Sequence, residues 1–459
     1  MGIAPRPTGS VADDRLEADM RTIRIRVLMG FAAGACLLVA LAGAPALGAP
    51  APTTRLVSVN SAGIKANRDS RFPAVNASGS IIAFSSDATN LVSADGNDRQ
   101  DVFVRDRAAA TTIRASVTPL GGEANDTSQR PSIDDAGKVV GFESLATNLV
   151  GGDTNDAQDV FVRILTQPPQ TRRVSVSSNG VEANDDSANA AVSPDGRYVA
   201  FASLASNLVP GDTNGMLDVF VKDLSTNAIR RIVGNGGVQG NGPSGIPSIS
   251  ADGTWVAFES RASNLVPGDT NQQGDVFVQK TATGATARVS VNSAGAQGNR
   301  ESRDPSISAD GRHVAFASDA TNLVGRDGNR SSDVFVHTLA AGTTERVSVN
   351  SAGVEGNGPS SEPSISTPPD QGIRVAFTSS ADNLIASDTN LRDDVFRHDS
   401  LLAQTTRWSV TQNGSQASGG NSAAPAITRS GDHIAFSSLA QNLVPGDGFN
   451  SLDVFVRGP

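Results

Sequence analysis

The chain has 459 residues, of which 46 are glycine and 23 are proline, and only 4% are aromatic. This composition favours many short strands joined by turns over long helices. The formal net charge is −10, and no basic block follows the N-terminal region, which argues against a nucleic acid partner. Cys36 is the single cysteine, so intramolecular disulfides are excluded, and cysteine-ligated zinc is excluded from the region after it.

The N-terminal region has the pattern of an export signal. Three arginines (Arg21, Arg24 and Arg26) precede an uncharged run over residues 27–49 that ends in small residues. Met20 is a candidate for the true start, because a signal beginning there has an ordinary length. Left uncleaved, the run is long enough to span a membrane. We therefore expect an extracytoplasmic protein that is secreted, periplasmic or held at the cell surface.

The remainder of the chain consists of seven copies of one repeat. The string Asp-Val-Phe recurs every 57 to 61 residues, and each occurrence follows a second motif, Phe-x-Ser-x-Ala-x-Asn-Leu. The two motifs together account for 14 of the 17 phenylalanines. Self-similarity at this period indicates a repeat architecture. The seven Asp-Val-Phe strings begin at Asp101, Asp159, Asp218, Asp275, Asp333, Asp394 and Asp453.

Each repeat contains four strand-like runs, which in the third copy cover residues 190–193, 197–203, 218–221 and 230–233. The turn Asp195-Gly196 joins the first two runs as a hairpin. Four-stranded repeats of this size are typical of propeller blades. The sequence therefore predicts an all-β, seven-bladed β-propeller of four-stranded blades, with two buried phenylalanines in each blade.

The two ends of the repeat region predict how the ring closes. The seventh copy lacks its fourth strand, and a matching run at residues 55–59 directly follows the signal. We expect this N-terminal strand to complete the last blade and remove an open sheet edge. The predicted organisation is an N-terminal extension with a signal peptide over 1–48, a short linker over 49–53 and the propeller over 54–459.

The repeat resembles the TolB-like, WD-type propeller repeats of exported bacterial proteins. The motif that carries the resemblance is Pro-Ser-Ile-Ser-Ala-Asp-Gly at 247–253, then Val-Ala-Phe at 256–258, then Asp-Val-Phe-Val at 275–278. The resemblance implies the fold over nearly all of residues 53–459, but propellers host many unrelated activities. TolB itself combines an α/β domain with six blades, and the seven predicted blades and the short linker depart from it.

The long loops of the predicted propeller lie on one face. Strands alternate in direction within a blade, so the loops between the second and third strands share a face with the loops between blades. In the third copy these are residues 207–217 and 234–245, and both exceed the hairpin turns in length. We expect the binding surface on this long-loop face.

The loop before each third strand carries an aspartate six positions ahead of the Asp-Val-Phe aspartate, and six copies have an asparagine two positions after it. Two carboxylates and an amide oxygen are hard ligands suited to Ca²⁺. The alternative is a hydrogen-bonded turn in which the second aspartate accepts loop amides, since the further acids of an EF-hand loop are missing. The Ca²⁺ candidates are Asp153, Asn155, Asp159, Asp212, Asn214, Asp218, Asp269, Asn271 and Asp275.

Residues repeated in all copies are expected to be architectural, because a single active site must break the sevenfold equivalence. A second repeated asparagine, such as Asn184, and the one preceding Leu-Val, such as Asn207, are interpreted as loop hydrogen bonding. His313 and His433 share a second-strand position with Tyr198, which indicates ordinary variation along a strand.

The sequence favours an exported, non-catalytic binding or scaffold protein. We expect a monomer that needs no cofactor and presents its long-loop face to a protein, glycan or envelope partner. One alternative is a Ca²⁺-dependent adhesion or surface module. The other is a propeller hydrolase, but a sialidase-like enzyme needs a tyrosine nucleophile and the only tyrosine is Tyr198, while the Gly-x-Ser-x-Gly string of a peptidase domain is absent.

Overall fold

The computed structural model describes residues 51–459 except 369, 371, 449 and 450, and residues from Pro50 onward form one compact unit. The predicted signal peptide over 1–48, with its candidate start at Met20, lies outside the described residues. The first strand begins at Thr53. Among the described residues, no helix has both the length and the apolar character needed to cross a membrane.

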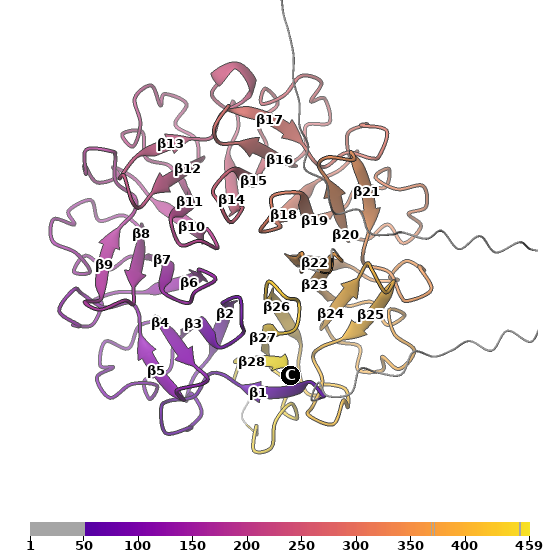
Figure 1. The fold of residues 1–459 in the computed structure, drawn as a ribbon, viewed down its shortest axis with the longest axis horizontal. Coiled ribbons are helices and arrows are strands. Elements are labelled where there is room, and N and C mark those ends of the chain that lie inside the picture. The colour runs from indigo at the N-terminus through magenta and orange to yellow at the C-terminus, as the bar shows by residue number, and fades with distance from the viewer. Residues whose placement is uncertain (1–50, 369, 371, 449–450) are drawn as a thin grey trace, which may run out of the picture. The chain divides into compact units, whose positions relative to one another are not determined.

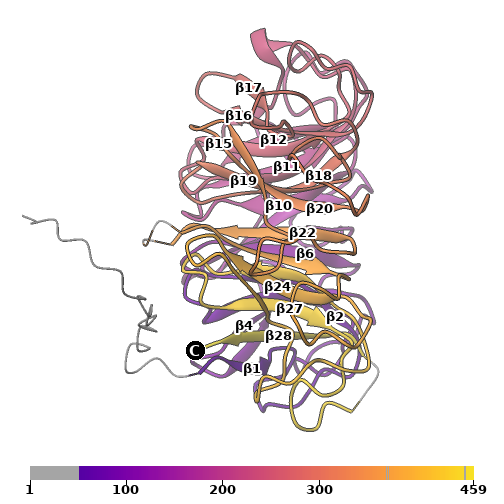
Figure 2. The ribbon, with the colours of Figure 1, turned by 90° about the vertical axis from the view of Figure 1, so that its right-hand side faces the viewer.

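The described chain forms seven antiparallel sheets of four strands arranged around a central axis, which confirms the predicted fold (Figure 1). A side view shows the loops gathered on the two faces of a disc (Figure 2). In each blade the first strand lies nearest the axis, and the fourth strand lies at the rim.

In each blade the four strands follow one another in order from the axis to the rim. Blade 1 contains β2 (Ser70–Val75), β3 (Ile81–Ser86), β4 (Asp101–Asp106) and β5 (Thr111–Arg114); blade 2 contains β6 (Ser128–Ile133), β7 (Val139–Ser144), β8 (Asp159–Ile164) and β9 (Gln170–Arg173); blade 3 contains β10 (Ser187–Val192), β11 (Tyr198–Ser203), β12 (Asp218–Asp223) and β13 (Ile229–Arg231). A short 3-10 helix, η1 (Asn235–Gly237), follows blade 3. Blade 4 contains β14 (Ser244–Ile249), β15 (Trp255–Ser260), β16 (Asp275–Lys280) and β17 (Ala285–Arg288); blade 5 contains β18 (Ser302–Ile307), β19 (His313–Ser318), β20 (Asp333–Thr338) and β21 (Thr343–Arg346); blade 6 contains β22 (Ser360–Ser366), β23 (Arg374–Ser379), β24 (Asp394–Asp399) and β25 (Gln404–Arg407); blade 7 contains β26 (Ser422–Ile427), β27 (Ile434–Ser438), β28 (Asp453–Gly458) and the N-terminal β1 (Thr53–Leu56).

The ring is closed by the N-terminal strand, as the sequence predicted. Strand β1 pairs antiparallel with β28, with Thr53 opposite Gly458 and Leu56 opposite Phe455. The last blade therefore has one strand from the start of the repeat region and three from its end, so the third strand of blade 7 is not left as an open edge.

The first strand of each blade differs from the prediction, because it contains a β-bulge. In blade 3 the predicted run over 190–193 captures only the second half of β10, which begins at Ser187. The pairing register shifts between Ala188 and Ala191, and Asn189 adopts a left-handed φ of 56°. A bulge breaks the alternation of side chains on which strand prediction depends, so the first half of the strand escaped notice.

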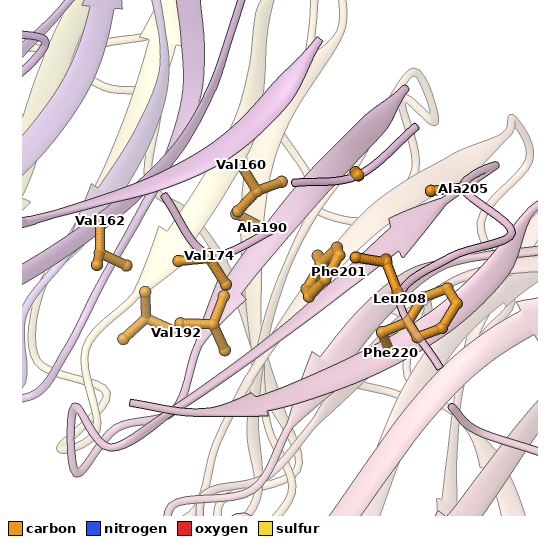
Figure 3. Packing of buried hydrophobic residues seen from close by; sticks show 11 residues of the cluster. Val160, Val162, Val174, Ala190, Val192, Phe201, Ala205, Leu208 and Phe220 are labelled. Carbon is orange, nitrogen blue, oxygen red and sulfur yellow. The ribbon is translucent and has the colours of Figure 1, made fainter. Parts of the chain in front are cut away.

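Packing between neighbouring blades forms the hydrophobic core. In blade 3 the rings of Phe201 and Phe220 stack with centroids 5.8 Å apart, and both are fully buried. Val160 and Val162 from the third strand of blade 2 belong to the same buried cluster, in which Val162 lies beside Val192 of blade 3 (Figure 3). The same arrangement recurs around the ring, so each blade buries its apolar face against the next one.

The face opposite the long loops carries the short hairpin turns. On this face, side chains of one blade contact glycines in the turns of the neighbouring blade. Tyr198, the first residue of β11, lies over Gly253, which has a φ of +68° in the hairpin turn of blade 4. A Cβ atom on Gly253 would lie 2.4 Å from Cδ2 of Tyr198. Trp255 and His433 cover Gly311 and Gly79 of their neighbouring blades in the same way. The variable second-strand position is therefore a contact between blades.

Two glycine substitutions separate this contact from backbone strain. Gly268→Ala changes a glycine with a φ of +76° and nothing within 4 Å of the new Cβ atom, and we expect it to lower the free energy of unfolding by about 1–2 kcal/mol through the left-handed backbone alone. Gly253→Ala adds the clash with Tyr198, for a further loss of about 1–3 kcal/mol. Denaturant unfolding of both variants measures the difference, and equal losses would contradict the contact.

Candidate functional site

The repeated loop aspartates converge on an arginine from the fourth strand. In blade 2, Nη1 of Arg173 lies 3.2 Å from Oδ1 of Asp153, 2.9 Å from Oδ2 of Asp159 and 2.7 Å from Oε2 of Glu182. We call this arrangement the acid–arginine cluster. The arginines of the other clusters are Arg114, Arg231, Arg288, Arg346 and Arg407. The sequence analysis overlooked these arginines, although they recur with the period of the repeat.

The hydrogen-bonded turn in each loop is made by the asparagine. In blade 2, the Oδ1 of Asn155 accepts the amide of Ala157 at 3.1 Å, while its Nδ2 donates to the carbonyl of Ala183 at 2.9 Å. Asp159 instead accepts from the hydroxyl of Ser175 and from Arg173. Among the loop amides, Nδ2 of Asn155 donates to Oδ2 of Asp159 at 3.3 Å, so the second aspartate does bond a loop amide, from a side chain, while the backbone turn is made by Asn155. A carboxylate beside a buried guanidinium is stabilised more by this charge-assisted hydrogen bond than by a hydrogen bond from a neutral amide.

Burial dominates the electrostatics of these carboxylates. It raises the pKa of Asp153 and Asp159, and the facing Arg173 acts in the opposite direction. In blade 1, burial and the neighbouring Asp101 raise the pKa of Asp95 to about 6. Neither oxygen of Asp95 accepts a hydrogen bond from the described residues, and Nη1 of Arg114 is 3.5 Å away.

The Ca²⁺ candidates of blades 2, 3 and 4 come together within each blade, but a guanidinium lies between their carboxylates. In blade 3, Nη1 of Arg231 is 2.8 Å from Oδ1 of Asp212 and 3.5 Å from Oδ2 of Asp218. The oxygens suit a hard cation, yet Ca²⁺ there would lie beside a positive charge. The Ca²⁺ assignment stays a prediction.

Within the described residues, the groups of three acids close enough to share an ion lie in blades 1 and 5, where the sequence analysis placed no Ca²⁺ candidate. They consist of Asp95, Asp101 and Glu123, and of Asp327, Asp333 and Glu355. The glutamate follows the fourth strand, and its place is taken by glutamine in blades 3, 4 and 6. Arg114 and Arg346 contact all three acids of their groups.

Blade 7 supplies its cation from a different position. Leu56 pairs with Phe455 where the other blades place the arginine. Lys65 stands at the glutamate position, as its isolated bridge with Val59 matches that of Glu123 with Val117. Its Nζ lies 2.5 Å from Oδ1 of Asp447 and 2.8 Å from Oδ2 of Asp453. Two substitutions relative to the repeat thus compensate each other.

Exchanging the charges in blade 7 tests this compensation. Lys65→Glu leaves Asp447 and Asp453 buried beside a third carboxylate, and we expect the free energy of unfolding to fall by about 3–5 kcal/mol. Adding Leu56→Arg rebuilds the arrangement of blade 1 and is expected to restore most of this loss. The double variant compared with each single variant gives the coupling. A double variant no more stable than Lys65→Glu would contradict the arrangement.

Removing an arginine tests the Ca²⁺ assignment. We expect the unfolding midpoint of the wild-type protein to be the same in EDTA and in millimolar Ca²⁺, because the guanidinium already contacts the carboxylates and would repel the ion. In Arg173→Ala the carboxylates lose that charge, and Ca²⁺ should raise the midpoint by mass action. A Ca²⁺-specific rise in the wild-type protein that Asp212→Ala abolishes would confirm the Ca²⁺ assignment instead.

The second set of repeated asparagines has the predicted role in loop hydrogen bonding. Nδ2 of Asn184 donates to the hydroxyl of Ser206 at 3.0 Å, and Oδ1 of Asn184 accepts the amide of Ser206 at 2.9 Å. Asn207 accepts the amide of Asn184 and donates to the carbonyl of Glu182. These bonds fix each segment that crosses from one blade to the next.

The bulges of the first strands place seven unlike side chains around the axis. Each bulge residue has a φ between 44° and 56°, a conformation that costs energy in any residue with a side chain. Together they line an axial cavity of about 360 Å³. We call these residues the collar; in ring order they are Phe72, Arg130, Asn189, Ile246, Asp304, Glu362 and Ala424.

The collar is chemically asymmetric. Arg130 of blade 2 lies 4.8 Å from the ring centroid of Phe72 in blade 1, a cation–π contact. Blades 5 and 6, on the other side of the ring, contribute Asp304 and Glu362 (Figure 1). The sequence analysis did not single out these residues. The available signal was the variable position that precedes Pro-Ser-Ile or its equivalent in each copy.

A second cavity, of about 290 Å³, lies beside the collar at the long-loop face. Its lining comes from the start of β14, the end of β15 and the segments before β12, β16 and β18. These are the strand ends that adjoin the long loops, between blades 3, 4 and 5. The long-loop face, predicted from loop lengths to be the binding surface, therefore carries a cavity next to the axial cavity of the collar, which we call the channel.

Comparisons with known proteins bear on the fold. No family model and no curated protein matches the chain. Among solved structures, a prolyl endopeptidase matches 88% of this chain and 51% of its own with 11% identity and a TM-score of 0.50. TolB from Acinetobacter baumannii matches with 14% identity over 78% of this chain and 76% of its own, and a putative TolB from Agrobacterium tumefaciens with 14% identity over 65% and 89%, both at a TM-score of 0.39. At these identities the matches concern the fold alone, and the strand topology itself shows that the chain is a seven-bladed β-propeller.

Proposed function

We propose that this protein is a non-catalytic binding protein that works outside the cytoplasm and engages a protein partner at its long-loop face, around the mouth of the channel. The observation that carries the proposal is the collar. Seven equivalent positions around the axis hold seven different side chains, whereas the Asp-Val-Phe and Phe-x-Ser-x-Ala-x-Asn-Leu motifs are the same in every copy. Recognition of one partner needs such a departure from symmetry.

The repeated polar residues are engaged in holding the ring and are not free for a partner. The loop aspartates contact arginine, and the crossing asparagines bond the neighbouring blade. The bulges carry a backbone cost that packing elsewhere must offset, a pattern found at binding sites. We therefore expect a partner to contact the variable side chains.

The long-loop face is also polarised between apolar and charged blades. Leu145 of blade 2 and Leu204 of blade 3 follow the second strand and are 45% and 39% exposed. The same position holds Asp87 in blade 1, Arg261 in blade 4, Asp319 in blade 5, Ser380 in blade 6 and a separate exposed leucine, Leu439, in blade 7. An apolar sector bordered by charged residues suits a protein interface.

Two alternatives rest on specific features. Carboxylates at the axis, Asp304 and Glu362, keep a propeller hydrolase as an alternative. However, Glu362 accepts hydrogen bonds from Thr378 and from the amide of Ala424, which is a positioning role within the ring. A Ca²⁺-dependent surface module requires ion binding at the acid–arginine clusters and is decided by the Ca²⁺ experiment above.

Site-specific photo-crosslinking tests the proposed face. A photoreactive residue at Leu204 should give an adduct of discrete mass in the organism that produces the protein. A photoreactive residue at Leu402, which is 64% exposed in a hairpin of the opposite face, serves as the matched control. Adducts of equal yield from both positions, or from neither, would contradict the proposal, and turnover of a hydrolase substrate by the purified protein would replace it with the enzymatic alternative.

A further inference from the structure

Blades 2 and 4 share a glutamate that no other blade carries. Glu143 and Glu259 both follow the repeated phenylalanine of the second strand. In blade 2 the carboxylate of Glu143 is fully engaged. Its Oε1 accepts Nε2 of Gln129 at 3.1 Å and lies 3.6 Å from Nε of Arg130, and its Oε2 accepts the amide of Asn189 at 2.7 Å.

Blade 4 lacks both of these side-chain donors. Gly245 pairs with Glu259 in the register in which Gln129 pairs with Glu143, and Ile246 follows where Arg130 stands. Glu259 accepts the amide of Asp304 at 3.3 Å, the equivalent of the Asn189 bond. Among the described residues, no side chain donates a hydrogen bond to it. Burial raises the pKa of Glu259, with the nearby charges of Asp304 and Glu301 acting in the same direction and the amide of Asp304 and the charge of Arg261 in the opposite one.

The missing side chains leave space in front of Glu259. The cavity of about 290 Å³ is lined by Gly245, Ile246, Leu217 and Glu259, together with Arg261 and Glu301. A Cβ atom added to Gly245 would meet only Cδ2 of Leu217, at 3.3 Å. Arg261 and Glu301 form an ion pair of 2.7 Å at the exposed edge, so these two charges offset each other.

We propose that this pocket receives a cationic side chain of the protein partner, an arginine-type or lysine-type group on an aliphatic stem. The nitrogen would donate to Glu259 from the space that Gln129 and Arg130 occupy in blade 2. The stem would pack on Leu217 and Ile246, which line the same cavity. Charge-assisted hydrogen bonds to a half-buried carboxylate are among the stronger polar contacts. This inference rests on the proposed function, because it assigns the pocket to the partner at the long-loop face.

Binding of small probes to the full chain tests the pocket. Nα-acetyl-L-arginine amide and Nα-acetyl-L-lysine amide carry the two cations, and Nα-acetyl-L-citrulline amide is the uncharged match. Titration followed by NMR or calorimetry at low ionic strength should show one of the cations binding at least about tenfold more tightly than citrulline amide. The cation that binds more tightly identifies the group.

Three variants locate the site. Glu259→Gln removes the charge, and Gly245→Gln copies the capping glutamine of blade 2 into the cavity; both should weaken cation binding by about tenfold or more. Glu143→Gln changes the matched glutamate of blade 2 and should leave binding unchanged. Circular dichroism and the unfolding midpoint check that each of the three variants is folded.

Equal binding of citrulline amide and the cations, absence of any cation binding, or equal loss in Glu143→Gln would overturn the pocket assignment. Photo-crosslinking from Leu204 does not depend on Glu259, so the two proposals fail separately. An adduct at Leu204 without cation binding rejects the pocket and keeps the binding face. Loss of both rejects the proposed function as well.

Discussion

The structure depends on one constraint, which is that no blade can bury its own apolar face. The third-strand valines of one blade share a buried cluster with the stacked phenylalanine pair of the next, and such a cluster recurs around the ring. Burial of these side chains supplies the main favourable term in folding. A blade without its neighbour would expose that face, so the last blade must meet the first. Strand β1 makes that closure, and with it every apolar face is covered.

A second requirement follows from the loops that the ring brings together. Each loop buries two aspartates, and buried carboxylates need a cation close by. Six blades provide an arginine from the fourth strand, whereas blade 7 provides Lys65 from the crossing segment, since Leu56 has replaced the arginine. Every blade therefore places a positive charge beside its two buried aspartates, but the residue that carries the charge, and its position in the repeat, can change. The acid–arginine clusters belong to the architecture of the long-loop face, and they hold the loops that surround the channel.

The rigid ring leaves variation to a small set of positions near the axis. Bulges in the first strands project seven different side chains into the channel, and the second-strand residues beside them differ as well. Glu143 and Glu259 show how small changes alter such a position. Gln129 fills one site and caps its glutamate, while Gly245 opens the other and leaves a cavity. Function in this protein is expected where the copies of the repeat disagree.

The sequence by itself determined the number of blades, the closure by the N-terminal strand and the buried phenylalanines, because these features follow from short-range alternation and from a period written seven times. It also identified the aspartates and asparagines of the loops. It missed the left-handed residues of the collar, since a bulge such as that at Asn189 interrupts the alternation from which strands are recognised. It also missed Arg173 as the common partner of Asp153, Asp159 and Glu182, because residues from a strand, a loop and a crossing segment meet only after the blade has folded. Repetition along a chain reveals the local units, whereas the environment of each charge is set by groups distant in sequence, which only the tertiary structure brings within a few ångströms of one another.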